Sequence, residues 1–429
     1  MSTRSEAARD ELDALFRAAL AAVEPGGALR RALAGTALPE RCVVVAIGKA
    51  AAALAAAFER EAGARIRRGV AITKDGHGRP LARLGLREAG HPLPDARSAA
   101  AGAEALALAA SAKPDETLVV LLSGGASALA SCPAPGLGLA ELRETTELLL
   151  RAGAEIDELN AVRKHLTRVS GGRLAAASRA REIVVLGISD VPGDDWATLG
   201  SGPCAADPST YAEALAALAR RGVLERVPAA VRRHLEAGAA GRVPESLKPG
   251  DPRLARVRSR WLASNRDALA AASEAGRARG LRVHGLTDRL RGEASRVGRR
   301  LAALARALAP GPPRLLLAGG ETTVTVRGRG RGGRAQELAL AAALELAGDR
   351  RVALLAAGTD GSDGPTPAAG AFADGGTVAR GAAAGVDARG ALTDNDSHGF
   401  FVREGGCFVT GPTGTNVMDL VLVRVANGA

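Results

Sequence analysis

Three groups of polar residues directly follow apolar runs that are typical of strands buried on both faces. Lys49 follows CVVVAI and Gly48, the segment 123–127 (SGGAS) follows TLVVLL, and Asp190 follows EIVVLGIS. Ligands of α/β sheets bind outside the carboxyl ends of the strands. An ammonium, a glycine-rich turn and a carboxylate at such ends can bind phosphate, a carboxylate or a hard cation. The sequence therefore predicts a ligand site at one edge of a sheet.

Lys49 stands in a strand–turn–helix unit, because the alanine-rich segment 50–63 favours a helix. The unit is not a P-loop, since Val43 occupies the position of the first glycine and Ala50 that of the Ser/Thr. Only five of the 57 basic residues are lysines, and a lysine in such a background suggests that a compact ammonium is needed. We favour a functional role for Lys49 over a surface role.

The glycine–serine turn after residue 122 offers backbone N–H groups and hydroxyls between a strand and a helix. It lacks the G-x-S-x-G spacing of a serine hydrolase, and no histidine motif offers itself as a base. A cradle for phosphate or carboxylate is therefore favoured over a nucleophile. Its candidate contacts are Ser123, Gly124, Gly125 and Ser127.

A second polar group lies in the segment 158–174, where helical spacing places Asn160, Lys164 and Thr167 on one face. Such a face is usually just solvated. The density of Asn, Arg, Lys and His before a Gly-Gly break slightly favours contact with substrate. The candidates for this contact are Asn160, Arg163 and His165.

The stretch 315–340 combines a predicted strand, a Gly319–Gly320 turn, the β-branched run TTVTV and a loop that alternates glycine with arginine. TTVTV favours a second strand, and a helix is predicted from Ala335. Glycines, arginines and a helix N-terminus together favour an anion site. A solvated hairpin tip on an arginine-rich protein is an equally good interpretation of this stretch alone.

Three carboxylates, those of Asp190, Asp194 and Asp195, follow one predicted strand. Oxygen ligands of this kind could hold a hard cation such as Mg²⁺. The alternative is an Asp-Pro-Gly turn with caps, which explains Asp194 or Asp195 without a metal. Asp190 stays the metal candidate because it sits directly at the strand end.

Length and composition exclude several classes of protein. A chain of 429 residues with 47% apolar residues favours two domains, and with only 2% aromatics their cores must consist of Ala, Leu and Val.

The N-terminus has no apolar signal core, and no apolar run could span a bilayer, so we expect a cytoplasmic protein without membrane contact. Four scattered cysteines predict neither disulfides nor zinc. The net charge of +11 suggests nucleic acid, but dispersed charges and few aromatics argue against it.

Alternating strands and helices predict an α/β fold of two domains, with an active site in the cleft between them. The Pro/Gly/charged stretch 244–252 places the boundary, giving domains at 1–243 and 253–429. We expect the amphipathic segment 5–23 to pack on the first domain, and the last strand or tail is a candidate to pack back on it. The oligomeric state stays open, with a homodimer as one alternative.

Many stretches in order resemble one family, the class II glycerate kinases (D-glycerate 2-kinases), whose C-terminal half is the MOFRL domain. The resemblance covers nearly the whole chain and rests on VVAIGKAA, GHPLPD, LLSGGASAL, NAVRKHL, ISDVPGDD, GSGP, GGETTV, GGRAQELAL, AAGTDGSDGPT and TGPTGTNVMDL. It implies a Rossmann-like N-terminal domain with a mostly parallel sheet and a smaller C-terminal α/β domain. It also implies ATP and D-glycerate as substrates, Mg²⁺ as cofactor, and 2-phosphoglycerate as product.

The resemblance also assigns residues. Lys49 and Arg334 correspond to the family's catalytic basic pair, and Asp360 matches an acidic residue of the same cleft. We expect the basic pair to stabilise the transferring phosphoryl group, and Asp190 and Asp360 to hold Mg²⁺ or orient the acceptor hydroxyl. Glu321 joins the cradle and the segment 160–165 as a candidate for substrate or phosphate.

The rival enzyme class is an NAD(P)H-dependent hydroxypyruvate reductase, which would use the same substrate neighbourhood and a Rossmann-like domain. Against it, no G-x-G-x-x-G follows the first predicted strand. The 2-position of phosphorylation comes from the family alone.

Overall fold

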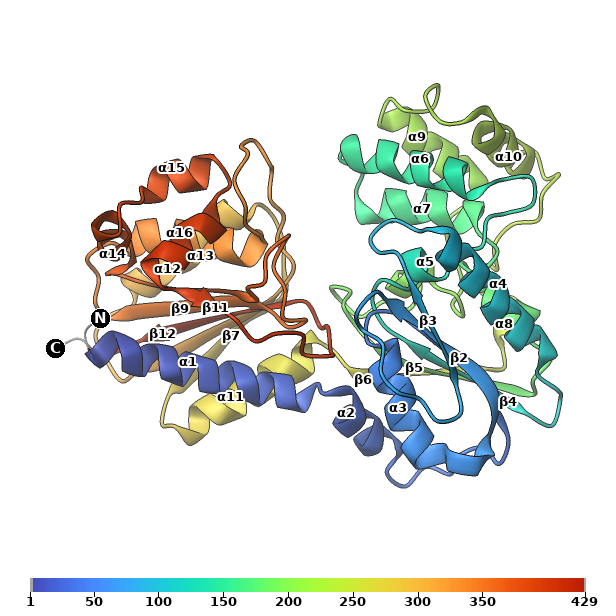
Figure 1. Ribbon diagram of the computed structural model, residues 1–429, viewed down its shortest axis with the longest axis horizontal. Helices are drawn as coiled ribbons and strands as arrows, with labels where there is room; N and C mark the ends of the chain where they lie inside the picture. The colour runs from blue at the N-terminus through green and yellow to red at the C-terminus, as the bar shows by residue number, and fades with distance from the viewer. Residues whose placement is uncertain (1–2, 428–429) are drawn as a thin grey trace. The chain divides into compact units, whose positions relative to one another are not determined.

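The computed structural model describes residues 3–427 and shows two compact α/β units. Ala28–Leu262 forms one of them, here called the central unit. The terminal unit combines the residues before Ala28 with those from Ala263 onward. Each unit contains one six-stranded sheet (Figure 1).

The sheet of the central unit has the strand order β3-β2-β1-β4-β5-β6. Its strands are β1 (Cys42–Ile47), β2 (Ile66–Lys74), β3 (Gly85–Ala89), β4 (Thr117–Leu122), β5 (Glu182–Ile188) and β6 (Val257–Ala263). The pairs β3–β2, β2–β1, β1–β4 and β4–β5 are parallel. This is the strand order of Rossmann folds, in which ligands bind where the order reverses, here between β1 and β4. The expected Rossmann-like, mostly parallel sheet is confirmed.

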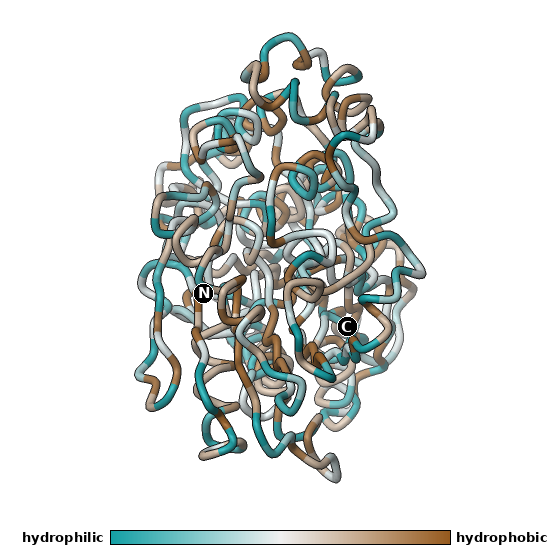
Figure 2. Tube along the Cα trace, turned by 90° about the vertical axis from the view of Figure 1, so that its right-hand side faces the viewer, coloured by the Kyte–Doolittle hydropathy of each residue, from teal (hydrophilic) through white to brown (hydrophobic). Residues whose placement is uncertain are grey.

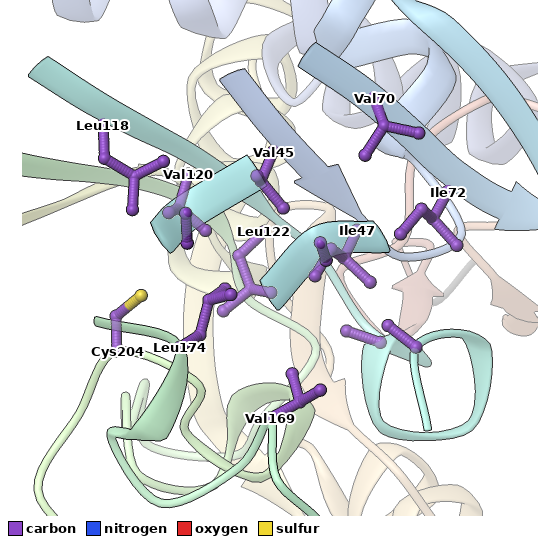
Figure 3. Packing of buried hydrophobic residues seen from close by; sticks show 14 of the residues in the cluster. Val45, Ile47, Val70, Ile72, Leu118, Val120, Leu122, Val169, Leu174 and Cys204 are labelled. Carbon is purple, nitrogen blue, oxygen red and sulfur yellow. The ribbon is translucent and has the colours of Figure 1, made fainter. Parts of the chain in front are cut away.

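Apolar side chains cover both faces of this sheet. The side chains of Val43, Val44, Val45 and Ala46 on β1 are all fully buried. Figure 3 shows Val45 and Ile47 beside Val120 and Leu122, over Val169 and Leu174. Helices α3 (Ala51–Ala62), α4 (Ala96–Ser111) and α5 (Ala126–Leu129) follow β1, β3 and β4, and α8 (Arg173–Ala177) precedes β5.

Four helices of the central unit form a separate group with its own apolar core. They are α6 (Leu139–Arg151), α7 (Ile156–Leu166), α9 (Tyr211–Arg220) and α10 (Ala229–Ala239), and Figure 1 shows them gathered beyond α5. The predicted helix with Asn160 and His165 is therefore confirmed as α7, and Thr167 lies just past its end.

The terminal unit has a mixed sheet in the order β11-β10-β9-β12-β8-β7. Its strands are β7 (Arg282–Leu290), β8 (Arg314–Gly320), β9 (Val352–Gly358), β10 (Gly370–Asp374), β11 (Cys407–Phe408) and β12 (Asp419–Val425). The pair β7–β8 is parallel and the other pairs are antiparallel. On one face lie α12 (Ala294–Ala307), α13 (Arg334–Leu346), α14 (Thr377–Ala383), α15 (Ala388–Thr393) and α16 (Ser397–Glu404) (Figure 1).

The N-terminal helix packs differently from the expectation. Helix α1 (Thr3–Ala22) lies beside α11 (Asn265–Ala278) on the other face of the terminal sheet (Figure 1). Its apolar side chains Leu12, Leu15 and Phe16 are fully buried, and the Phe16 ring meets Phe408 edge-on at 5.3 Å. The last strand, β12, pairs with β8 and β9 of the same unit, so the tail does not join the N-terminal domain. After α1, helix α2 (Pro25–Leu33) spans the point where the chain passes between units.

The units also differ from the expected domains at 1–243 and 253–429. Strand β6 (Val257–Ala263) is the edge strand of the central sheet, so the chain leaves this unit after residue 262. The stretch 244–252 is not a linker, because its backbone is bound within the central unit. Leu247 donates its N–H to Gly171 O, and its own carbonyl accepts from Asp207 N.

The run TTVTV at 322–326 is not a strand, apart from an isolated bridge between Thr323 and Glu293. The run and the loop after it are held by polar side chains and not by a partner strand. Thr325 N–H donates to Glu293, and Arg327 and Gly328 donate to Asn395 Oδ1.

The glycine–arginine loop is fixed to the segment 394–396 by its backbone. Arg329 N–H donates to Asp394 and Arg331 N–H to Asp396, each at 3.0 Å. A Cβ at Gly328 would lie 2.2 Å from Asp394 O, so this glycine is required by close packing. The side chains of Arg327, Arg329 and Arg331 are exposed, as the solvated interpretation predicts, but the loop is not the tip of a β-hairpin.

Among the described residues no helix is long and apolar enough to cross a membrane. Figure 2 shows why, since hydrophobic and hydrophilic residues alternate in short runs along the chain.

A tight helix crossing in the terminal unit gives a testable prediction. A Cβ at Gly298 of α12 would lie 2.1 Å from the backbone oxygen of Leu338 on α13. Gly298→Ala should therefore lower the free energy of unfolding by about 1–3 kcal/mol through overpacking, measured by urea denaturation. Gly285→Ala is the control, because nothing lies within 4 Å of a Cβ at Gly285. Equal stability of the two variants would contradict this close crossing of α12 and α13.

Candidate functional site

The turn between β1 and α3 is fixed against the turn that follows β4. Lys49 N–H donates to Gly124 O at 2.8 Å, and Ala50 N–H donates to the Ser123 hydroxyl at 3.0 Å. Gly48 has a φ of 131°, and a Cβ there would lie 2.2 Å from Ser123 Oγ. Only glycine allows this approach. Lys49 is thus held at the point where the strand order reverses.

The segment Gly124–Gly125 is the meeting point of three strand ends. A Cβ at Gly124 would lie 1.5 Å from Oδ2 of Asp190, which follows β5. A Cβ at Gly125 would lie 3.2 Å from Cγ of Lys49 and 3.0 Å from the ring of His91. The structure therefore brings together the predicted residues Lys49, Ser123, Gly124, Gly125 and Asp190.

The Asp195 carboxylate is engaged by the turn that follows it. Asp195 accepts hydrogen bonds from Ala197 N and Thr198 Oγ1, so it caps the turn that follows. This bears out the turn-and-cap interpretation for Asp195 and leaves Asp190 as the carboxylate beside the cradle.

Ser127 and Asn160 are joined through Ser201, which sequence reasoning had not singled out. Ser201 Oγ lies 3.0 Å from Ser127 Oγ and 2.9 Å from Asn160 Oδ1. The chain of polar groups links α5, the short turn η2 (Leu199–Ser201) and α7. The GSGP motif in the sequence was the available signal for Ser201.

Arg163 lies one helical turn after Asn160 and lines a small cavity with Ser127 and Thr167. Burial lowers the pKa of the Arg163 guanidinium to about 10. A cation in a poorly solvated position is costly unless an anion accompanies it.

His165 is not part of this group. Its Nδ1 lies 2.6 Å from Ala161 O, its Nε2 lies 3.0 Å from Glu245, and its ring packs on Tyr211 at 4.4 Å. The side chain is fully buried in the helical group, where it serves packing. The structure gives no support to a substrate contact at His165.

In the terminal unit, Arg334 begins α13 and is held by two carboxylates. Its Nε and Nη2 donate to the two oxygens of Asp419 at 2.6 and 2.8 Å, and its Nη1 lies 2.9 Å from Glu321 Oε1. Burial opposes the charged form, but the Asp419 carboxylate holds the pKa of Arg334 above its usual value. Asp419 is itself buried, whereas Glu321 is 45% exposed.

Antiparallel pairing explains this contact. Asp419 starts β12 and stands opposite Gly320 at the end of β8 and Gly358 at the end of β9. Asp360 stands two residues after the end of β9, and its carboxylate accepts from Ser362 N and Oγ. Sequence reasoning missed Asp419, because a reversed last strand is needed to bring it to this edge.

Asp363 was also missed as a site residue. Its carboxylate accepts from the N–H groups of Ala335 and Gln336 at 3.0 and 2.8 Å, and so caps α13 beside Arg334. Burial, with a further contribution from Asp419, raises the pKa of Asp363 to about 6. Its position in the TDGSDG motif was the available signal.

No three His, Cys, Asp or Glu side chains within residues 3–427 gather closely enough to hold a metal ion by themselves. Mg²⁺ commonly takes one or two protein carboxylates and completes its shell with water and substrate phosphates. Asp190 in the central unit and Asp360 in the terminal unit each offer one carboxylate of this kind.

Comparison with known proteins identifies the family to which the residues around Lys49 and around Arg334 belong. Residues 11–236 match a domain of unknown function, DUF4147, and residues 314–419 match the MOFRL family. A glycerate 2-kinase of Pyrococcus horikoshii is 39% identical over 90% of this chain and 87% of its own length. A D-glycerate 2-kinase of Thermotoga maritima is 37% identical over 95% of this chain and 96% of its own. The chain belongs to the glycerate kinase family.

A glycerate kinase structure from T. maritima superimposes with a TM-score of 0.87 at 36% identity, covering 98% of this chain and all of that one. A P. horikoshii structure gives a TM-score of 0.80, also at 36% identity, over 98% and 99% of the two chains. Within this glycerate kinase family member, Lys49 and its cradle lie in the DUF4147 region and Arg334 lies in the MOFRL region. A protein of Agrobacterium vitis with a provisional hydroxypyruvate reductase name is 38% identical over 99% of this chain and 96% of its own.

The raised pKa of Asp363 predicts a pH-dependent contribution to stability. An unfolded aspartate titrates near 3.9, so the folded protein binds this proton more tightly. The contribution of Asp363 is therefore complete below about pH 4 and is lost as the pH rises through about 6. Asp363→Asn stays neutral. Urea unfolding from pH 4 to 7 should show wild type losing stability relative to the variant, and parallel curves would contradict the assignment.

Proposed function

We propose that the protein transfers the γ-phosphoryl group of ATP to the 2-hydroxyl of D-glycerate, giving 2-phosphoglycerate and ADP. The similarity to proteins named glycerate 2-kinase over nearly the whole chain supports glycerate phosphorylation. In the reaction the hydroxyl oxygen forms a bond to the γ-phosphorus, the bond to the β–γ bridging oxygen breaks, and the hydroxyl proton passes to a base.

The observation that carries this proposal is the position of Lys49. Phosphoryl transfer depends mainly on positioning and on stabilising the charge of the transferring group. Lys49 is fixed by its backbone beside a turn of N–H groups and hydroxyls, at the strand-order reversal where α/β sheets bind ligands. Such a site suits a phosphate group far better than a neutral substrate.

Arg334 is the second cation of the proposal. Asp419 takes two of its donor groups and fixes the plane of the guanidinium. Glu321 is the more exposed of its partners, so an incoming phosphate oxygen would replace this carboxylate at lower cost. We assign Asp419 to positioning Arg334, and Glu321 to the contact that substrate displaces.

We assign Asp190 and Asp360 to Mg²⁺ binding and to the acceptor hydroxyl. When bound, Mg²⁺ would neutralise the charge that develops on the phosphate oxygens. The carboxylate that does not hold the ion would orient the hydroxyl and accept its proton. The remaining candidates, Ser123 to Ser127 with Asn160 and Arg163, would contact the substrate's carboxylate, hydroxyls or phosphate oxygens.

A direct assay separates this proposal from its rival. Purified protein with ATP, Mg²⁺ and D-glycerate should form ADP, and ³¹P NMR of the product should identify the 2-phosphate. The rival, a hydroxypyruvate reductase, should consume NADH or NADPH with hydroxypyruvate. If no ADP forms from ATP and D-glycerate, and hydroxypyruvate instead drives oxidation of NADH or NADPH, the reductase replaces the kinase as the function of this protein.

Removal of either cation should abolish most of the turnover. We expect Lys49→Ala and Arg334→Ala each to lower kcat by roughly 10³-fold or more, on the precedent of transition-state arginines. Lys113→Ala and Arg327→Ala are matched controls, because both residues are exposed outside the candidate site. Near wild-type turnover in either Lys49→Ala or Arg334→Ala would remove that residue from the mechanism.

A further inference from the structure

Arg163 is a partly buried basic side chain that lacks the protein partners found at several others. Lys164 is paired with Asp207, Arg173 donates to the carbonyls of Lys164 and Ser170, and Arg334 is paired with Asp419. Across residues 3–427, the Arg163 guanidinium has no hydrogen bond and no ion pair. Burial still lowers its pKa to about 10. An arginine stays charged at neutral pH even so, which leaves a poorly solvated cation without a counter-ion.

A second polar group nearby also lacks a partner. Asn160 is only 5% exposed, and its Nδ2 is buried without an acceptor. Its Oδ1 is already bonded to Ser201. If the amide were turned by 180°, Nδ2 would bond Ser201 and the oxygen would be left unpaired instead. In either orientation one buried polar atom has no protein partner, which is costly unless a ligand or water supplies one.

The cavity beside Arg163 sets the size and charge of its occupant. Hydroxyl groups make up much of its wall, and none of the described residues that line it is acidic; the lining residues are Pro94, Ser127, Ala128, Ser131, Leu142, Thr146, Arg163 and Thr167. Its volume of about 10 Å³ is the room of a single water molecule. A polyphosphate does not fit, whereas one oxygen of a carboxylate does.

The cavity adjoins the cradle through the chain itself. Ser127 lines the cavity and stands two residues after Gly125, beside which the Lys49 side chain runs. In a 2-hydroxy acid the carboxylate is attached to the carbon that bears the hydroxyl. A carboxylate bound at Arg163 would therefore keep that hydroxyl close to the cavity, whose lining residue Ser127 belongs to the cradle.

We propose that Arg163, with Asn160 and Ser127, forms a carboxylate subsite that binds the acid group of the substrate. Lys49 and the turn 123–125 are then left for the phosphoryl group. The assignment to glycerate rests on the proposed function, whereas the preference for a carboxylate rests on the residues of the subsite. The subsite makes the protein select 2-hydroxy acids and reject glycerol, which has the hydroxyls but not the charge.

Binding and kinetics of two variants test the subsite. Arg163→Ala should weaken D-glycerate binding, measured by calorimetry without nucleotide, by about 10- to 100-fold, as expected for the loss of a charged hydrogen bond. It should raise KM for D-glycerate and leave KM for ATP unchanged. Arg163→Lys should recover only part of the affinity for D-glycerate, because lysine keeps the positive charge but lacks the paired, planar N–H donors that match a carboxylate. Arg168→Ala is the matched control, since Arg168 is exposed five residues later.

A second variant keeps the test decisive if Arg163→Ala does not fold. Asn160→Asp places a carboxylate one turn from Arg163, supplies the missing counter-ion from within and should abolish D-glycerate binding in a folded protein. Wild-type affinity for D-glycerate in Asn160→Asp or in folded Arg163→Ala would overturn the subsite. Equal affinity of wild type for glycerol and D-glycerate would also overturn it.

The two proposals fail separately. Arg163-dependent binding of D-glycerate without ADP formation from ATP would leave the subsite standing and remove the kinase function. ADP formation with an unchanged KM for D-glycerate in Arg163→Ala would support the kinase function and remove the carboxylate subsite.

Discussion

The contact between the turns after β1 and β4 is the constraint on which the candidate site of the central unit depends. The backbone of Lys49 and Ala50 bonds directly to Gly124 O and the Ser123 hydroxyl, which holds the two turns in direct contact. Gly48 and Gly124 leave no space for a Cβ, so a cation and an acid can approach one short backbone segment from different strands. A parallel sheet makes this geometry available, because all its strands end at the same edge.

The terminal unit reaches a similar arrangement by a different route. Its strands β8 and β9 flank the reversed strand β12, so the start of one strand meets the ends of two others. Asp419 therefore lies where it can hold Arg334 with two hydrogen bonds. A single carboxylate at the start of the last strand fixes the residue that we assign to the transferring phosphoryl group.

Strand ends were predictable from the sequence because buried parallel strands appear as unbroken apolar runs, and Lys49, Ser123 and Asp190 directly follow such runs. The contacts of Asp419 and Asp363 were not predictable in this way, since they depend on strand direction and on a turn that folds back over a helix start. Composition misled in two places. TTVTV has strand propensity but finds no partner strand, and the stretch 244–252 resembles a linker although its backbone is bound within a unit.

Because α1 pairs with α11, the N-terminal helix is synthesised long before the helix on which it packs. The apolar face of α1, with Leu12, Leu15 and Phe16, leaves the ribosome before the whole central unit, and its partners are translated more than 230 residues later. The central unit can close its own sheet during this interval, whereas α1 has no native surface to cover. A nascent chain of this protein therefore exposes the apolar face of α1 until the segment that forms α11 has been translated.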